Sequence, residues 1–184
     1  PEILEDGENE LPDLYRPTLH RMHARLVELR EDIEAMTKEV DGLVKQHPIC
    51  QRLTAIEGIG PIGALSLYAV MGSGKAFTKS REFSAYLGLT PRQYSSGGKT
   101  TIVGLSKKIG NSRLRSVLIL GARAYVYKLK EPRSPKDRWL QASIERNGES
   151  RAAIALANKN VRTAWAMVTQ GTEYQRQQKL EMAA

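Results

Sequence analysis

Apolar side chains that alternate in steps of four and three residues dominate the N-terminal part of the chain. The series comprises Tyr15, Leu19, Met22, Leu26, Leu29, Ile33, Met36, Val40 and Leu43. This spacing is typical of the a and d positions of a coiled coil over about four heptads. A helix of about thirty residues is about 45 Å long, which is too long to bury such a seam against a small domain. We therefore expect a coiled-coil helix over residues 14–46 that pairs with a second copy of the chain. The alternative is a single long helix that packs on a further domain or on the chain itself.

Proline and glycine residues divide the rest of the chain. Residues 1–13 are acidic and contain Gly7 and Pro12, so we expect a flexible lead before the long helix. His47-Pro48 should end that helix, because proline disfavours the α conformation of the residue before it. In the remaining part of the chain, residues 47–184, the sequence predicts short helices on both sides of a turn at Gly58-Ile59-Gly60. Further helices are expected at about 79–88, 111–129, 136–146 and 151–169.

Residues 89–109 are expected to form a long loop rich in glycine, serine and basic residues, with at most a short extended piece at Thr100–Val103. The predicted fold class is therefore all-α, with a coiled-coil helix followed by a helical domain that carries one basic loop.

Charge is distributed unevenly along the chain, which has a formal net charge of +8. Residues 1–46 hold twelve acidic and six basic side chains (net −6), whereas residues 47–184 hold eight acidic and 22 basic ones (net +14). Residues 83–130 contain no acidic residue but nine basic ones: Arg92, Lys99, Lys107, Lys108, Arg113, Arg115, Arg123, Lys128 and Lys130. Such a surface repels itself unless a polyanion binds to it, and nucleic acid is the obvious polyanion. The alternative is a coiled-coil assembly protein whose basic charge is incidental.

The remaining composition excludes several classes of protein. The only cysteine is Cys50, so no disulfide can form within the chain and a reducing compartment is expected. No apolar run approaches the length of a membrane span, and no signal peptide is recognisable, so no membrane partner is expected. The chain begins at Pro1 rather than methionine, and we expect it to be a piece of a longer protein.

The segment Ile56-Glu-Gly-Ile-Gly-Pro-Ile-Gly-Ala64 resembles the helix-hairpin-helix module of DNA-binding proteins, here at about residues 50–72. Gly58 and Gly60 can adopt positive φ and carry no side chain. The N–H groups at the start of the following helix would then face a phosphate oxygen. The alternative is a corner between two helices that binds nothing.

The run Ser95-Ser-Gly-Gly-Lys-Thr100 is a candidate for chemistry on phosphates. It is not a phosphate-binding P-loop, because Gln93 stands where the upstream glycine is required. A serine in a cationic loop can attack a phosphodiester once its proton is removed and the developing charge is stabilised. The candidate cations that would hold the phosphate are Arg92, Lys99, Lys107, Lys108, Arg113 and Arg115.

A base is missing near this serine, since residues 83–130 contain neither carboxylate nor histidine. Either the serine only binds phosphate, or its activating groups come from elsewhere. No group of His, Cys, Asp and Glu has the spacing of a metal site. Aromatic residues do not interleave with the basic run as in single-strand binders, because Tyr94 is its only close aromatic.

Several of these segments together resemble the C-terminal transposase domain of the insertion sequence 110 family, the DEDD-type transposases related to the pilin-gene invertase. They are Leu53–Gly60, Ser84–Thr100 and Gly104–Arg115. Gly121–Ala124 and Ala155–Ala166 resemble the tail of the subgroup named after insertion sequence 1111. The resemblance covers about residues 50–170, and the helix before it is similar to the coiled coil that joins the two domains of family members.

The resemblance implies a transposase or recombinase whose serine nucleophile precedes the glycine pair, which is Ser96 here, with Ser95 as the second choice. It implies that this chain binds no cofactor. Mg²⁺ is expected in a RuvC-like domain, with its DEDD carboxylates, that this chain does not contain. The implied partners are DNA, a guide RNA encoded by the element, and further copies of the protein. The expected location is the bacterial cytoplasm at the nucleoid, and this piece alone should bind nucleic acid without cutting it. The alternative is a helix-hairpin-helix module without catalytic activity.

Overall fold

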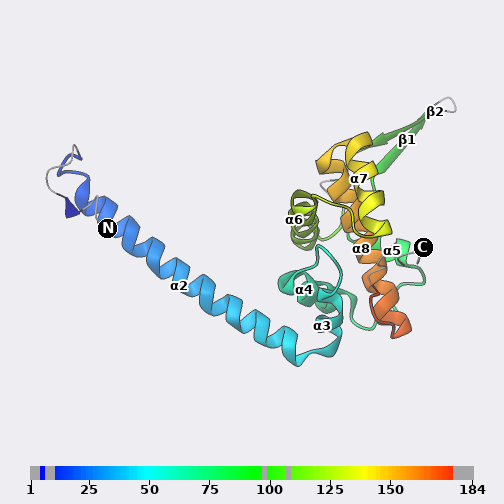
Figure 1. Cartoon of the computed structure of the whole chain (residues 1–184), viewed down its shortest axis with the longest axis horizontal. Coiled ribbons are helices and arrows are strands. Elements are labelled where there is room, and N and C mark those ends of the chain that lie inside the picture. Colours follow the sequence, from blue (N-terminus) through cyan, green and yellow to red (C-terminus); the bar gives the residue numbers. More distant parts are fainter. Residues whose placement is uncertain (1–4, 7–10, 97–98, 107–108, 176–184) are drawn as a thin grey trace, which may run out of the picture. The chain divides into compact units, whose positions relative to one another are not determined.

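The computed structural model describes residues 5–6, 11–96, 99–106 and 109–175, with residues 96 and 99–102 described by their backbone only. The chain divides into two compact units, residues 1–43 and 44–184. Along the chain follow α2 (Arg16–Gln46), α3 (Pro48–Thr54), α4 (Pro61–Met71), α5 (Ser80–Tyr86), β1 (Arg92–Ser96), β2 (Lys99–Val103), α6 (Ser112–Lys128), α7 (Pro135–Asn147) and α8 (Glu149–Gln170) (Figure 1). Helices dominate the described residues, so the predicted all-α class is confirmed.

Helix α2 is one continuous helix of 31 residues. Arg16 ties the preceding turn to it: its Nε pairs with Asp13 Oδ1 at 3.1 Å, and its guanidinium also donates to the carbonyls of Leu11 and Asp6. The seam residues lie largely exposed, with Met22 at 63%, Ile33 at 63% and Met36 at 64%. The helix ends at Gln46, directly before His47-Pro48, as the proline predicts.

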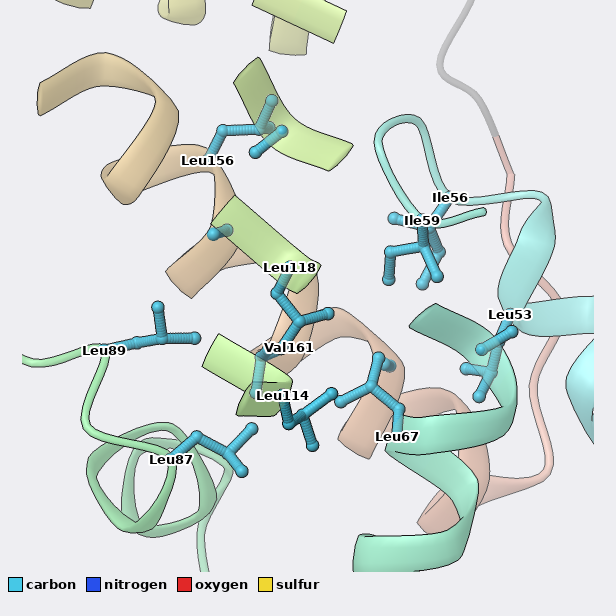
Figure 2. Packing of buried hydrophobic residues seen from close by; sticks show 14 of the residues in the cluster. Leu53, Ile56, Ile59, Leu67, Leu87, Leu89, Leu114, Leu118, Leu156 and Val161 are labelled. Carbon is cyan, nitrogen blue, oxygen red and sulfur yellow. The ribbon is translucent and has the colours of Figure 1, made fainter. Parts of the chain in front are cut away.

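The core of the second unit forms around α8, which packs against α5, α6 and α7, while α4 packs against α3 and α6. Figure 2 shows leucine and isoleucine side chains from these elements meeting in one cluster. Leu67 comes from α4, Leu114 and Leu118 from α6, and Leu156 and Val161 from α8, and each is at most 4% exposed. Burying such side chains contributes about 1.5–3 kcal/mol each, so this cluster dominates the stability of the unit.

The segment predicted as a long loop instead contains a two-stranded antiparallel ribbon. β1 pairs with β2 in the register Arg92↔Val103 to Ser96↔Lys99, so two residues join the strands. The sequence carries the signal for this hairpin, because a Gly-Gly pair precedes the β-branched run Thr100–Val103. The prediction of an irregular loop was therefore wrong at residues 92–96, whereas the expected extended piece at Thr100–Val103 lies within strand β2.

The start of α7 is fixed by a buried carboxylate. Ser134 Oγ accepts from the Asp137 N–H, and Asp137 Oδ2 accepts from the N–H groups of Arg133 and Ser134, which forms a capping box. Tyr125 Oη donates to Asp137 Oδ1 at 2.6 Å and so ties α6 to α7. Burial raises the pKa of the Asp137 carboxyl, but these hydrogen bonds outweigh burial and hold its pKa below the ordinary value. Among the described residues, no helix is both long enough and apolar enough to cross a membrane.

Candidate nucleic-acid interface

Two glycines with positive φ hold the base of the ribbon together. A Cβ at Gly110 (φ 84°) would meet the carbonyl carbon of Leu87 at 2.5 Å and the nitrogen of Gly88 at 2.6 Å. A Cβ at Gly88 (φ 72°) would meet the Ile109 carbonyl oxygen at 2.5 Å. The end of α5 and the loop before α6 therefore approach each other at a distance that only glycine permits.

Arg115 completes this junction. Its Nη1 donates to the carbonyl oxygen of Ile109 at 2.6 Å and lies 3.4 Å from that of Gly88. The sequence predicted Arg115 as a phosphate-binding cation, whereas the structure shows its guanidinium bonded to backbone carbonyls. From the other side, Asn158 Nδ2 on α8 donates to the Leu89 carbonyl at 3.0 Å, just before β1. The sequence analysis missed Asn158, because it lies 69 residues away and no local pattern marks it.

The first strand of the ribbon exposes two of the predicted site residues, Arg92 and Ser95. Arg92, Tyr94 and Ser95 are exposed, and Arg92 Nη1 lies 3.5 Å from Tyr94 Oη. The backbone register brings Ser96 opposite Lys99 at the end of the ribbon, next to the Gly97-Gly98 pair. The structure thus brings together Ser95, Ser96 and Lys99 in one short segment.

The remaining predicted cations divide into two groups. Arg113 is exposed in the first turn of α6, and no ion pair involves it among the described residues. The predicted sites Lys107 and Lys108 lie outside the described residues. The N-cap of α6 is Asn111, whose Oδ1 accepts from the Leu114 N–H at 3.1 Å, so Arg113 stands at a helix start beside the ribbon base.

The two glycines of the hairpin at residues 58–60 have different environments. Gly58 has a φ of 87°, and a Cβ there would meet Ala122 Cα at 3.2 Å and the Gly121 carbonyl oxygen at 3.3 Å. It therefore lets the turn pack against α6. Gly60 is exposed, has a negative φ of −88° and would have nothing within 4 Å of a Cβ. Of the two glycines, only Gly58 uses a positive φ, whereas Gly60 leaves open space at the start of α4.

A polar cluster also holds this turn. Lys136 Nζ pairs with Glu57 Oε2 at 2.8 Å, and Tyr174 Oη donates to the same oxygen at 2.5 Å. Asn160 Nδ2 donates to the Glu57 carbonyl at 2.7 Å. Burial raises the pKa of the Glu57 carboxyl, but the hydrogen bonds from Lys136 and Tyr174 outweigh it and hold the pKa below its ordinary value. The pKa of the Lys136 ammonium also lies below its ordinary value, with burial as the largest cause, although Glu57 acts to raise it.

The described residues of this unit offer neither a metal centre nor a cysteine nucleophile. Within the part of the chain that the structure describes, no three His, Cys, Asp or Glu side chains gather as metal ligands would. The carboxylates of Glu57, Glu82 and Asp137 are each engaged by hydrogen bonds. Cys50 is 0% exposed, and burial raises the pKa of its thiol, so it is not a candidate nucleophile. The described residues therefore offer no carboxylate set that would hold the magnesium that the resemblance implies.

A groove of about 600 Å³ runs beneath the ribbon, between its two strand ends and α8. Its lining combines apolar side chains with one cation and two amides: Leu89, Pro91, Leu105, Ile154, Arg151, Asn147 and Asn158. Fold and surface together define a basic helical protein with an exposed ribbon, a class suited to binding a polyanion.

Comparisons with known proteins identify the family to which the chain is similar. Residues 50–137 match the model of the family described as "Transposase IS116/IS110/IS902 family". The chain is 42% identical over 156 residues to the transposase for insertion sequence element IS1111A of Coxiella burnetii, covering 85% of this chain and 43% of that protein. It is 40% identical over 167 residues to the transposase for insertion sequence element IS1328 of Yersinia enterocolitica, covering 91% and 50% respectively.

A more distant match, 28% identical over 151 residues, is the 43.6 kDa protein of insertion element IS110 of Streptomyces coelicolor, with 82% of this chain and 36% of that protein covered. The chain belongs to the IS116/IS110/IS902 family of transposases. It spans about half the length of the first two relatives and a smaller share of the third. The resemblance stated from the sequence is thereby confirmed.

Proposed function

We propose that this chain is the C-terminal, serine-bearing part of an insertion-sequence transposase. The observation that carries the proposal is the ribbon, which is exposed at residues 92–95. Its backbone register brings Ser96 and Lys99 to its end, within an acid-free, basic segment of a transposase-family chain. A ribbon that extends from the base formed by Gly88 and Gly110 can reach the backbone of a bound duplex. We propose that the complete transposase needs, for its activity, a further domain that this chain does not contain.

In the proposed reaction Ser96 Oγ attacks a DNA phosphorus atom. The Oγ–P bond forms and the P–O bond to one deoxyribose breaks. The deoxyribose oxygen leaves with a proton, and the serine proton passes to a base. The phosphoserine ester conserves the bond energy, so a second strand's hydroxyl can reverse the step and join DNA without an external energy source. Positive charge such as that of Lys99, which is paired with Ser96 in the register of the ribbon, would stabilise the additional negative charge at the phosphate.

The base and the magnesium are proposed to belong to a RuvC-like domain, because residues 83–130, which include Ser96, contain neither a carboxylate nor a histidine. Alone, the chain is therefore proposed to bind nucleic acid and not to cut it. The exposed start of α4 at Gly60 and the exposed Arg113 are proposed contacts to the phosphate backbone, which fix position without reading bases. A guide RNA encoded by the element is proposed as a second nucleic-acid partner.

Helix α2 is proposed to pair with α2 of a second copy. Its seam leaves Tyr15, Met22, Leu26, Leu29, Ile33, Met36 and Leu43 between 44% and 64% exposed. A 31-residue helix with this much apolar surface gains stability by burying it in a coiled coil. Two copies would then bring two serine-bearing ribbons to one DNA complex.

The proposal is tested by recombination with the complete transposase, its element RNA, substrate DNA and magnesium, followed by denaturing gels that detect a protein–DNA adduct. We expect an adduct that survives denaturation, disappears in Ser96→Ala and persists in Ser95→Ala, the matched control one residue away. Loss in Ser95→Ala alone would move the nucleophile to Ser95. Recombination at the normal rate by Ser96→Ala would refute the serine mechanism, leaving this chain as a helix-hairpin-helix module that only binds.

A further inference from the structure

Helix α6 carries a face that is exposed within the described part of its unit. Its buried residues Leu114, Leu118, Ala122 and Val126 follow helical spacing on one side. The opposite side exposes Arg113, Ser116, Leu120, Arg123, Ala124, Tyr127 and Lys128, which we call the α6 face. From Arg113 to Tyr127 this face runs about 21 Å along the helix (α6 in Figure 1).

Two large side chains on the α6 face are far more exposed than apolar side chains of a helix normally are. Tyr127 is 83% exposed and Leu120 is 60% exposed. The contrast with Tyr125 on the same helix is informative: Tyr125 is half-buried and its hydroxyl donates to Asp137 at 2.6 Å. Tyr127 points away from that contact, with its ring available to a partner.

The charge of the α6 face identifies the kind of partner. No acidic residue occurs in residues 83–130, and among the described residues no ion pair engages Arg113, Arg123 or Lys128. At the C-terminal end of α6 a cavity of about 440 Å³ follows, lined by Lys128, Lys130 and Arg133 with one carboxylate, Glu131. Cations beside an exposed ring match a strand of nucleic acid, in which phosphates alternate with bases.

We propose that the α6 face binds an unpaired stretch of nucleic acid, with the Tyr127 ring stacked on a base and Arg123 and Lys128 at the flanking phosphates. Paired bases in a duplex are stacked on their neighbours and leave no ring face for Tyr127, so the proposal names a single strand. The sequence argued against single-strand binding because the basic run around the serines has no interleaved aromatic. The helix removes that objection, because it brings Tyr127 onto the same face as cations that precede it by up to fourteen residues.

This inference rests on the proposed function only in taking nucleic acid as the partner. The test measures binding of the 184-residue chain to a fluorescein-labelled oligothymidylate of about 20 nucleotides, and to a duplex of the same length, by fluorescence anisotropy. We expect Tyr127→Ala to weaken single-strand binding by about 5- to 100-fold and duplex binding by far less. The matched control Tyr127→Phe keeps the ring and should bind within about twofold of the unchanged chain.

Each alternative has its own result. Equal single-strand affinity of Tyr127→Ala and the unchanged chain would overturn the proposal. An equal loss on the duplex would also overturn it, since the ring would then not contact an unpaired base. A change in oligomeric state by Tyr127→Ala without nucleic acid would assign the face to a protein contact instead. The two proposals fail separately: normal recombination by Ser96→Ala would refute the serine mechanism alone, whereas an unchanged single-strand affinity of Tyr127→Ala would overturn this inference alone.

Discussion

Replacing Lys136 by methionine should destabilise the helical unit strongly, because it strips a buried carboxylate of its cation. Lys136 Nζ lies 2.8 Å from Glu57 Oε2, and the two side chains are only 13% and 9% exposed. Methionine keeps much of the length and volume of lysine, so the change isolates the charge. Tyr174 alone would remain as the side-chain donor to this oxygen among the contacts described.

The magnitude follows from the burial of the pair. Removing one partner of a fully buried ion pair costs about 3–5 kcal/mol, and the slight exposure of this pair reduces that to about 2–4 kcal/mol. For a chain of this size each kcal/mol shifts the midpoint of thermal unfolding by about 2–4 °C, so the expected decrease is roughly 4–16 °C. Urea unfolding followed by circular dichroism gives the free energy directly.

The pH dependence gives a second readout. In the unchanged chain the folded-state pKa of Glu57 lies below its ordinary value of 4.5, so its contribution is present above that pH and is lost as the pH falls through the folded pKa. Without Lys136, burial should raise that pKa instead, and protonation of Glu57 then relieves the penalty in acid. The stability difference between the two proteins should therefore narrow as the pH falls from neutral to below 4.5.

The matched control is Lys159→Met, which removes the same charge from an exposed side chain whose Nζ lies 4.5 Å from the centre of the Trp139 ring. We expect Lys159→Met to lower the free energy of unfolding by less than about 1 kcal/mol. The double variant Glu57→Gln/Lys136→Met should recover most of the stability that Lys136→Met loses, because the Glu57 site then holds no charge. A Lys136→Met protein as stable as Lys159→Met, with the same pH profile as the unchanged chain, would refute the reasoning.

Three further predictions concern the ribbon base, the seam and a helix cap. Gly110→Ala should lower the free energy of unfolding by at least about 2 kcal/mol, because the positive φ of Gly110 and its contact with the residues after α5 both oppose a Cβ. The control Gly104→Ala, where a Cβ would have nothing within 4 Å, should lower it by less than about 1 kcal/mol in the same urea titration. Ile33→Asp should weaken self-association at least tenfold in sedimentation experiments, whereas Ala24→Asp on the outer face of the heptad should not; no change in either would contradict the coiled coil. Ser134→Ala should lower stability by about 1 kcal/mol through loss of the α7 cap, and an unaltered melting temperature would show that the cap contributes nothing.

Much of the fold was predictable because its signals are local. His47-Pro48 predicted the end of α2, and the apolar spacing predicted α6, α7 and α8 to within a few residues. The ribbon was predictable in principle from the Gly-Gly pair and the β-branched run after it, but the density of glycine and serine favoured an irregular loop. Strand pairing depends on a partner segment, so a five-residue strand carries a weaker signal than a helix of seventeen residues.

The candidate site was predictable only as a set of residue types. The acid-free segment, the serine pair and the family resemblance follow from the order of residues, because charge and motif need no fold to be recognised. The division of roles within that set does not follow from the order. In the sequence, Arg115 cannot be told apart from Arg113, yet Arg115 bonds to backbone carbonyls and Arg113 is exposed. In the same way, Gly58 packs against α6 whereas Gly60 is exposed.

The sequence by itself determined the helical class, the ends of the helices, the apolar seam of α2 and the family, since backbone preferences and periodicity are set by near neighbours. Tertiary structure alone decided which glycines permit close approach, which cations face solvent, and that Tyr127 shares an exposed face with Arg123. It also joined Glu57 to Lys136 and Tyr174 across 79 and 117 residues. Burial and hydrogen-bond partners arise from contacts between distant segments, and those exist only once the chain has folded.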